Sequence, residues 1–137
     1  MNVGVGDIVV VGTLAWKLYK NCKESSAEFK RISSEVASLH VVIKETEENV
    51  DESQGLSPSR EARLTILLDG CKEVLSDLDR LLNNYESLGT QAQRTWDRLR
   101  WGMAGLADVR SRIISNTTLL TAFNSSLTRC AVVHVTS

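Results

Sequence analysis

Apolar side chains recur in this chain at alternating steps of three and four residues, and this spacing constrains the fold more than any other feature. Steps of that size place side chains on one face of an α-helix in a heptad pattern. The clearest run follows Ser25-x-x-Glu28, a capping-box pattern that predicts a helix start. Its members are Phe29, Ile32, Val36, Leu39, Ile43 and Val50, with Thr46 in one position.

The same spacing returns after residue 57. Ser57 suits the N-cap of a helix and Pro58 its first turn, where the missing N–H costs nothing. Gly89 is expected to end this helix, and Thr90-x-x-Gln93 forms a second capping box. The apolar residues of this seam are Leu64, Leu67, Cys71, Val74, Leu78, Leu81, Tyr85 and Leu88. Leu68, Leu75 and Leu82 widen the seam into the broader apolar stripe that is typical of a bundle core.

The C-terminal part of the chain continues at helical spacing, although Gly102 and Gly105 predict a kink or break. Its apolar residues are Trp96, Leu99, Met103, Leu106, Val109, Ile113, Leu120, Phe123 and Leu127. The acidic stretch 45–52 should fray the end of the preceding helical run into a solvated loop, because negative charge is unfavourable at a helix C-terminus.

The N-terminal segment, residues 3–23, is VGVGDIVVVGTLAWKLYKNCK. The chain lacks the Gly-Lys-Ser/Thr of a phosphate-binding loop, and Val9 stands where a dinucleotide-binding Gly-x-Gly-x-x-Gly needs its third glycine. A signal peptide requires basic residues before its apolar run, but no Lys or Arg precedes Lys17. The apolar run from Ile8 to Trp16 is also short for a membrane span, which needs about 20 residues. A helix is the best interpretation.

In that helix Asp7 is the expected N-cap, because its carboxylate can accept hydrogen bonds from the free amides of the first turn. The stripe that would face a core is Ile8, Val11, Leu14, Ala15, Leu18 and Cys22. Val9, Val10 and Trp16 fall on the far side, so the first two turns are apolar nearly all round. We expect neighbouring helices to cover these three residues, and the alternative is that they contact a membrane or a partner protein.

These segments predict an all-α fold, a helical bundle of four to five helices that are mainly antiparallel. Residues 1–128 would form one helical domain, which suits a chain of 137 residues. Residues 129–137 fit no helix pattern and are expected to be an irregular tail, of the kind left at a truncated junction.

No catalytic residue, cofactor or small-molecule substrate is expected. His40 and His134 are interpreted as solvated or hydrogen-bonded side chains rather than general bases. Cys22 and Cys71 lie on predicted core faces, where a thiol behaves as a small apolar group. The three cysteines are far apart and form no C-x-x-C pair, which argues against a disulfide framework and favours a reducing, cytoplasmic location.

No metal site is expected either. Asp69, Glu73 and Asp77 repeat every four residues on one helix face, but the sequence does not bring four ligands together, so a solvated face is the preferred interpretation.

Arginines gather near two tryptophans late in the chain. Ordinary bundle surface is the preferred interpretation, and the alternative is a protein-docking face with Arg94, Arg98, Arg100 and Arg110 as its candidate residues. Arg112, Trp96 and Trp101 lie among them. The formal net charge of −1 and the absence of a recognisable module argue against nucleic-acid binding.

Four strings together resemble a known family. They are GDIVVVGTLAWKLYKNCK, EFKRISSEVASLHVVIKETEE, LLDGCKEVLSDLDRLLNNYESLG and RTWDRLRWGMAGLADVRSRI. This combination is similar to the HeLo-like helical N-terminal domain of filamentous fungi, which precedes ankyrin repeats or nucleotide-binding NACHT-type (STAND) modules. The resemblance covers about residues 3–128 and is most specific at Gly6–Lys20 and Thr95–Arg98.

The resemblance implies a non-enzymatic adaptor domain in fungal signalling or incompatibility-type recognition, with other proteins or a second copy as partners. Some relatives act on membranes through the N-terminal helix. The alternative function is therefore a membrane-active effector that inserts this helix, in which case the protein would be membrane-associated.

Overall fold

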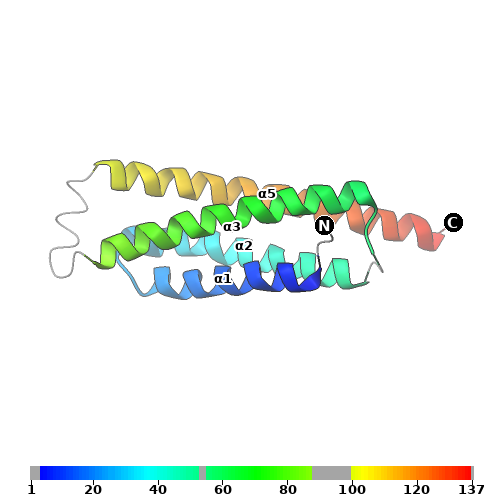
Figure 1. The fold of residues 1–137 in the computed structure, drawn as a ribbon, viewed down its shortest axis with the longest axis horizontal. Helices are drawn as coiled ribbons and strands as arrows, with labels where there is room; N and C mark the ends of the chain where they lie inside the picture. The colour runs from blue at the N-terminus through cyan, green and yellow to red at the C-terminus, as the bar shows by residue number, and fades with distance from the viewer. Residues whose placement is uncertain (1–3, 53–54, 88–99, 137) are drawn as a thin grey trace.

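The computed structural model describes residues 4–52, 55–87 and 100–136. These residues form four helices, α1 (Val5–Lys23), α2 (Ala27–Glu52), α3 (Pro58–Glu86) and α5 (Arg100–Thr136), and contain no strand. The helices lie along one another in an elongated bundle (Figure 1). The predicted all-α class and helical bundle are therefore confirmed.

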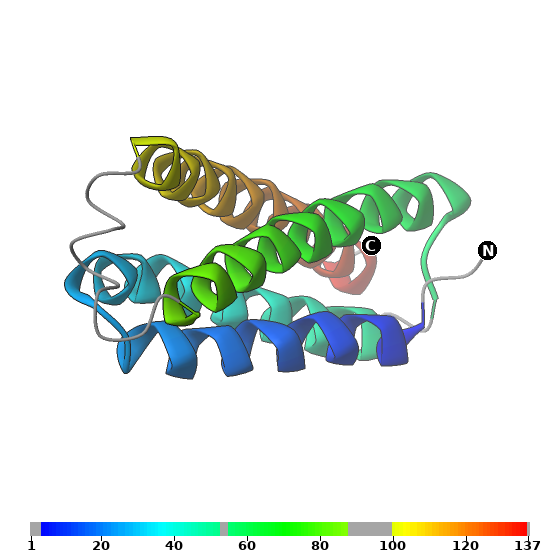
Figure 2. The ribbon, with the colours of Figure 1, turned by 60° about the vertical axis from the view of Figure 1, so that its left-hand side comes forward.

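The four helices form a ring around the core. α1 packs against α2 and α3, and α5 packs against the same two helices, so α2 and α3 lie across the bundle from each other. Figure 2 shows α1 beside α2 on one side, with α3 and α5 on the other. The connection between α2 and α3 therefore crosses the ring diagonally.

The core of the described residues consists largely of the apolar runs found in the sequence. Of the predicted members, Leu88, Trp96, Leu99 and the side chain of Met103 lie outside the described residues. Among the residues whose burial is described, twenty-four buried apolar residues come from all four helices, and the largest fully buried side chains include Phe29 and Phe123. Full burial of such a side chain contributes about 1.5–3 kcal/mol before entropy is counted. On α3, Leu68, Leu75 and Leu82 are buried, and members of the predicted seam such as Leu67 only flank them.

Helix starts follow the predicted signals in part. Ser57 caps α3, since its hydroxyl accepts a 3.3 Å hydrogen bond from the Arg60 amide, and Pro58 occupies the first turn. Asp7 is not the N-cap of α1. Gly4 occupies that position, and the Asp7 carboxylate reaches back to accept from the Gly4 amide at 3.1 Å. The carboxylate thus accepts a hydrogen bond from one backbone amide at the start of α1, and it does so from the third helical position.

Two predicted interruptions are absent from the helices. α2 continues through the acidic stretch to Glu52, because Thr46 and Val50 are buried in the bundle and this packing outweighs the unfavourable charges. α5 includes both Gly102 and Gly105 and continues to Thr136, so residues 129–136 are helical and not an irregular tail. Continuing a helix needs no nucleation, so it can extend beyond its apolar pattern.

α1 and α2 approach each other closely at Gly12. A Cβ atom placed there would lie 3.3 Å from Cγ2 of Ile43, which is tighter than ordinary van der Waals contact. The Gly12 carbonyl also lies 3.1 Å from Nδ1 of His40. The missing side chain therefore lets the two backbones approach each other.

Substitution of Gly12 tests this contact. We expect Gly12→Leu to destabilise the fold by about 1–3 kcal/mol, because the added side chain overpacks the α1–α2 contact. Urea denaturation followed by circular dichroism measures the change. Gly6→Leu is the matched control, since a Cβ at Gly6 meets nothing within 4 Å. Equal effects of the two variants would contradict the packing argument.

Candidate functional site

The outer side of α1 carries large apolar side chains that the bundle leaves exposed. Val10 is 61% exposed, Trp16 47% and Val9 40%, so the expectation that neighbouring helices cover them is wrong. α1 packs against only two helices, which contact its inner stripe. Val41 on α2 is also exposed, at 54%. Val9, Val10, Trp16 and Val41 are the exposed large apolar residues of α1 and α2, and we call this set the apolar patch.

Aromatic contacts hold Trp16 at the junction of α1 and α2. Its ring centroid lies 5.3 Å from that of Tyr19 and 5.2 Å from that of His40, both tilted. The ammonium groups of Lys20 and Lys23 lie over the rings of Trp16 and Tyr19, at 5.9 and 5.7 Å. Such aromatic and cation–π contacts contribute about 0.5–1.5 kcal/mol each. Trp16 is therefore both exposed and held in place.

His40 has a structural position within this cluster. Its Nδ1 lies at hydrogen-bond distance from the Gly12 carbonyl, and its ring packs on Trp16. Nδ1 therefore donates to that carbonyl in the matching tautomer. His40 thus links α1 to α2 beside the apolar patch, which agrees with a hydrogen-bonded helix histidine.

The candidate docking arginines are described only in part. Arg94 and Arg98 lie outside the described residues, as does the side chain of Arg100. Arg110 donates from Nε to the Glu35 carboxylate at 2.7 Å, which joins α5 to α2. Partial burial acts to raise the pKa of Glu35, but hydrogen bonds from Arg110 and Ser34 outweigh it and lower that pKa. The Arg110 guanidinium is thus engaged within the bundle.

A second arginine joins α3 to α5. Arg112 donates to Asp77 on α3 at 2.8 Å and to Asp108 on its own helix at 3.3 Å, and it lies 3.9 Å from Glu73. The hydrogen bond to Asp77 is the main reason that the pKa of Arg112 is raised. Arg80 also binds Asp77, at 2.5 Å.

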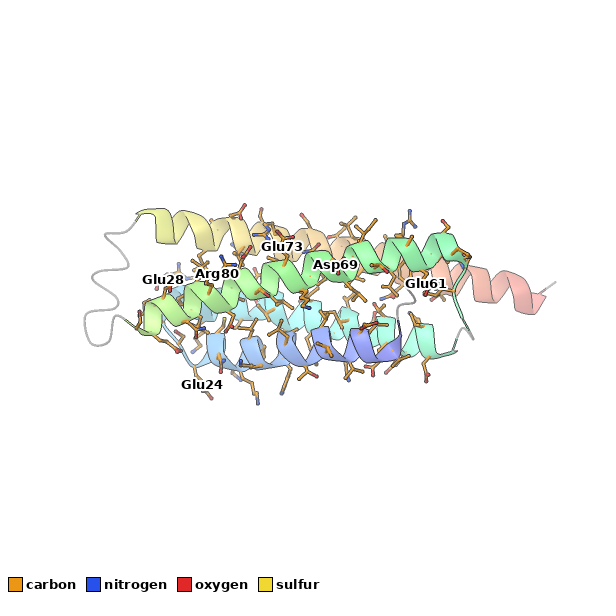
Figure 3. The ribbon with its side chains drawn as sticks, viewed as in Figure 1. Glu24, Glu28, Glu61, Asp69, Glu73 and Arg80 are labelled. Atoms are coloured by element: carbon orange, nitrogen blue, oxygen red, sulfur yellow. The ribbon has the colours of Figure 1, made fainter. Side chains whose placement is uncertain are left out.

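An open cleft between α3 and α5, with a volume of about 370 Å³, is lined by charged residues from both helices, namely Glu73, Asp77, Asp108 and Arg112. Its other lining residues are Gly70, Ser115 and Asn116. Figure 3 labels Asp69, Glu73 and Arg80 along α3. The predicted solvated acidic face is therefore partly engaged, because Asp77 is 27% exposed and binds two arginines. In the described residues no group of three His, Cys, Asp or Glu side chains is placed to hold a metal ion.

Cys22 and Cys71 are buried in the core, as their positions on the apolar stripes indicate. Desolvation by burial raises the pKa of each thiol to about 12, and nearby Asp79 and Glu86 add to the effect at Cys22. A thiol with so high a pKa supplies almost no thiolate near neutral pH, which does not suit a nucleophile.

Val41 is an exposed apolar residue that the predicted stripes do not include. The residue lies between two core positions, Leu39 and Ile43, and helical geometry places it on the opposite side of α2. An apolar residue at an outward position was therefore the available signal. Among the described residues, no helix has a stretch long and apolar enough to cross a bilayer.

No protein-family model, curated protein or solved structure matches this chain.

The buried thiols should resist alkylation. We expect iodoacetamide at pH 8 to leave Cys22 and Cys71 unmodified in the native protein, because thiols with a pKa of about 12 are almost fully protonated there. The same treatment in urea should modify both, and peptide mass spectrometry measures each site. Rapid native modification of either residue would show that it is not enclosed.

The Glu35–Arg110 pair should contribute stability that depends on pH. Because the pKa of Glu35 is lower in the folded than in the unfolded protein, the pair stabilises the fold when the pH is above the unfolded pKa, which is about 4.3. This contribution is lost as the pH falls through the folded pKa. We expect Arg110→Gln to cost up to about 1 kcal/mol at pH 7 and nothing once Glu35 is protonated. Urea titrations at pH 7 and under acid conditions measure this.

Arg63→Gln is the control for this substitution, because Arg63 is exposed and forms no salt bridge with any described residue. A loss for Arg110→Gln that persists unchanged at low pH would mean that the side chain acts through packing and not through its charge.

Proposed function

We propose that this chain is a non-enzymatic interaction domain that binds another protein through the outer face of α1 and α2. The apolar patch is the observation that carries the proposal. The exposed surfaces of these valines and of Trp16 are not buried by the fold, whereas exposed aromatic and apolar side chains are typical of binding sites.

The finer architecture is part of the proposal. We infer that α1 and α2 run in opposite directions, as expected of a mainly antiparallel bundle. Two contacts support this. Trp16 packs on His40, and Gly12, four residues earlier on α1, lies against Ile43, three residues later on α2. The short connection between the two helices, residues 24–26, also favours a reversal.

A resemblance to fungal HeLo-like domains suggests the setting, namely cytoplasmic signalling or incompatibility-type recognition. The support is the string similarity described above and the all-helical bundle, a fold that this family shares with many others. Arg94, Arg98 and Arg100 remain proposed docking residues. Arg110 is a weaker candidate than these, because binding to a partner would compete with its ion pair to Glu35.

Membrane activity is the second candidate function. Exposed Trp16 and the lysines at positions 17, 20 and 23 follow the apolar start of α1, and amphipathic helices that lie on membranes combine such residues. This function would require α1 to lie on the lipid surface or to leave the bundle, at the expense of its buried stripe from Ile8 to Cys22.

Photo-crosslinking distinguishes a protein partner from a lipid surface. A photo-reactive amino acid in place of Val10 should yield protein adducts in extract of the native host cells, and Trp16→Ala should reduce their yield about tenfold, as for a central interface tryptophan. The same amino acid in place of Ile66, which is 71% exposed on α3, is the matched control.

Vesicle leakage provides the opposing result. The purified chain should not release dye from vesicles that contain anionic lipid. Leakage that Val10→Asp abolishes, together with an absence of protein adducts from position 10, would favour the membrane function and overturn the proposal.

A further inference from the structure

Charged residues of opposite sign flank the apolar patch at its two ends. Lys17, Lys20 and Lys23 are exposed on the C-terminal half of α1. Glu45, Glu48 and Asp51 are exposed on the C-terminal half of α2. Because α1 and α2 run in opposite directions in the proposed arrangement, the lysines lie towards one end of this face and the acidic residues towards the other.

None of these six side chains forms a salt bridge with another described residue. The ion pairs in the described ranges involve other carboxylates, such as Glu35, Glu47 and Asp77. Lys20 and Lys23 contact aromatic rings, which leaves their hydrogen-bond donors without a carboxylate. The face therefore carries two blocks of uncompensated charge.

The two blocks have the same spacing. The lysines and the acidic residues each repeat every three residues, a step of about 4.5 Å along a helix. Residues three apart form a row on the helix surface, and such rows are the ridges by which helices pack. The midpoint between the blocks lies near Thr13 and Val41, within the apolar patch and its immediate surroundings.

We propose that this face binds a second copy of the same chain in a two-fold symmetric dimer, an inference that rests on the proposed function. The second copy is turned end for end, so that the lysine row of each copy faces the acidic row of its partner. Lys17, Lys20 and Lys23 then meet the partner's Glu45, the partner's Glu48 and the partner's Asp51. Both apolar patches meet at the centre.

Self-complementarity is the reason to choose a second copy over a different protein. A two-fold interface places the same surface on both sides, so every charge on one half must find its opposite on the other half. This face meets that requirement with equal numbers of charges at equal spacing. A central apolar patch with a charged rim also matches the usual composition of protein interfaces.

Complementary charge reversal tests the dimer. One variant carries Lys17→Glu, Lys20→Glu and Lys23→Glu, and the other carries Glu45→Lys, Glu48→Lys and Asp51→Lys. Sedimentation velocity at low salt should show a dimer for the unmodified chain and a dissociation constant about tenfold or more higher for each variant alone. An equimolar mixture of the two variants should recover the dimer, because opposite rows meet again at both ends.

Folding is followed by circular dichroism for each variant, because the lysine-to-glutamate variant loses the cation–π contacts of Lys20 and Lys23 and places negative charge near the C-terminus of α1. Recovery of the dimer in the equimolar mixture then shows that a weaker dimer in each variant alone reflects charge and not unfolding. Positive charge at a helix C-terminus is favourable, so the Glu45, Glu48 and Asp51 variant should be at least as stable as the unmodified chain. Arg63→Glu and Asp69→Lys, at exposed positions on α3, are the matched controls and should leave the dimer unchanged. Val10→Asp should weaken the dimer of the unmodified chain and the dimer of the mixed variants. High salt should also weaken the dimer, because it screens the attraction between the lysine row and the acidic row.

A monomeric unmodified chain at about 100 μM, or a mixture of the reversed variants that fails to dimerise, would overturn the proposal of a second copy, since dissociation constants for specific dimers rarely exceed the micromolar range. Protein adducts from position 10 that contain only a different protein would overturn it as well, yet leave the proposed interaction function standing. An absence of any adduct, including the crosslinked dimer, would overturn both.

Discussion

The contact between α1 and α2 at Gly12 is the constraint on which the surface of this protein depends. The absence of a Cβ atom brings the Gly12 carbonyl to His40 and leaves Ile43 just beside the α1 backbone. The same approach places Trp16 against the His40 ring. If the two helices lay further apart, the exposed valines of α1 and Val41 of α2 would lie further from each other.

Most of the fold could be predicted because burial follows the helical period. The stripes on α2 and α5, from Phe29 to Val50 and from Leu106 to Leu127, are buried as their spacing indicates. Local signals were less reliable. Asp7 lies at the third helical position, and the acidic end of α2 stays helical, because packing across the bundle outweighs the preferences of single residues.

The candidate site was predictable only where it depends on one helix. Helical periodicity identified Val9, Val10 and Trp16 as outward residues of α1, although not that they would be exposed. The partners of Arg110 and Arg112 on other helices, Glu35 and Asp77, lie 75 and 35 residues away in the sequence, and no local pattern encodes such pairs. The same holds for Asn124, whose amide donates to the carbonyl of Val42 from across the bundle.

The ring order of the helices has a consequence for how the chain folds. α1 and α2 are neighbours in sequence and can pair early, but α2 and α3 have little direct contact. Both must wait for α5, whose hydrogen bonds to α2 span up to 82 residues. Closing contacts that are so distant in sequence is slow, so during synthesis the parts of α2 and α3 that pack against α5 stay uncovered until α5 has emerged from the ribosome. The nascent chain is then most vulnerable to aggregation and to capture by chaperones.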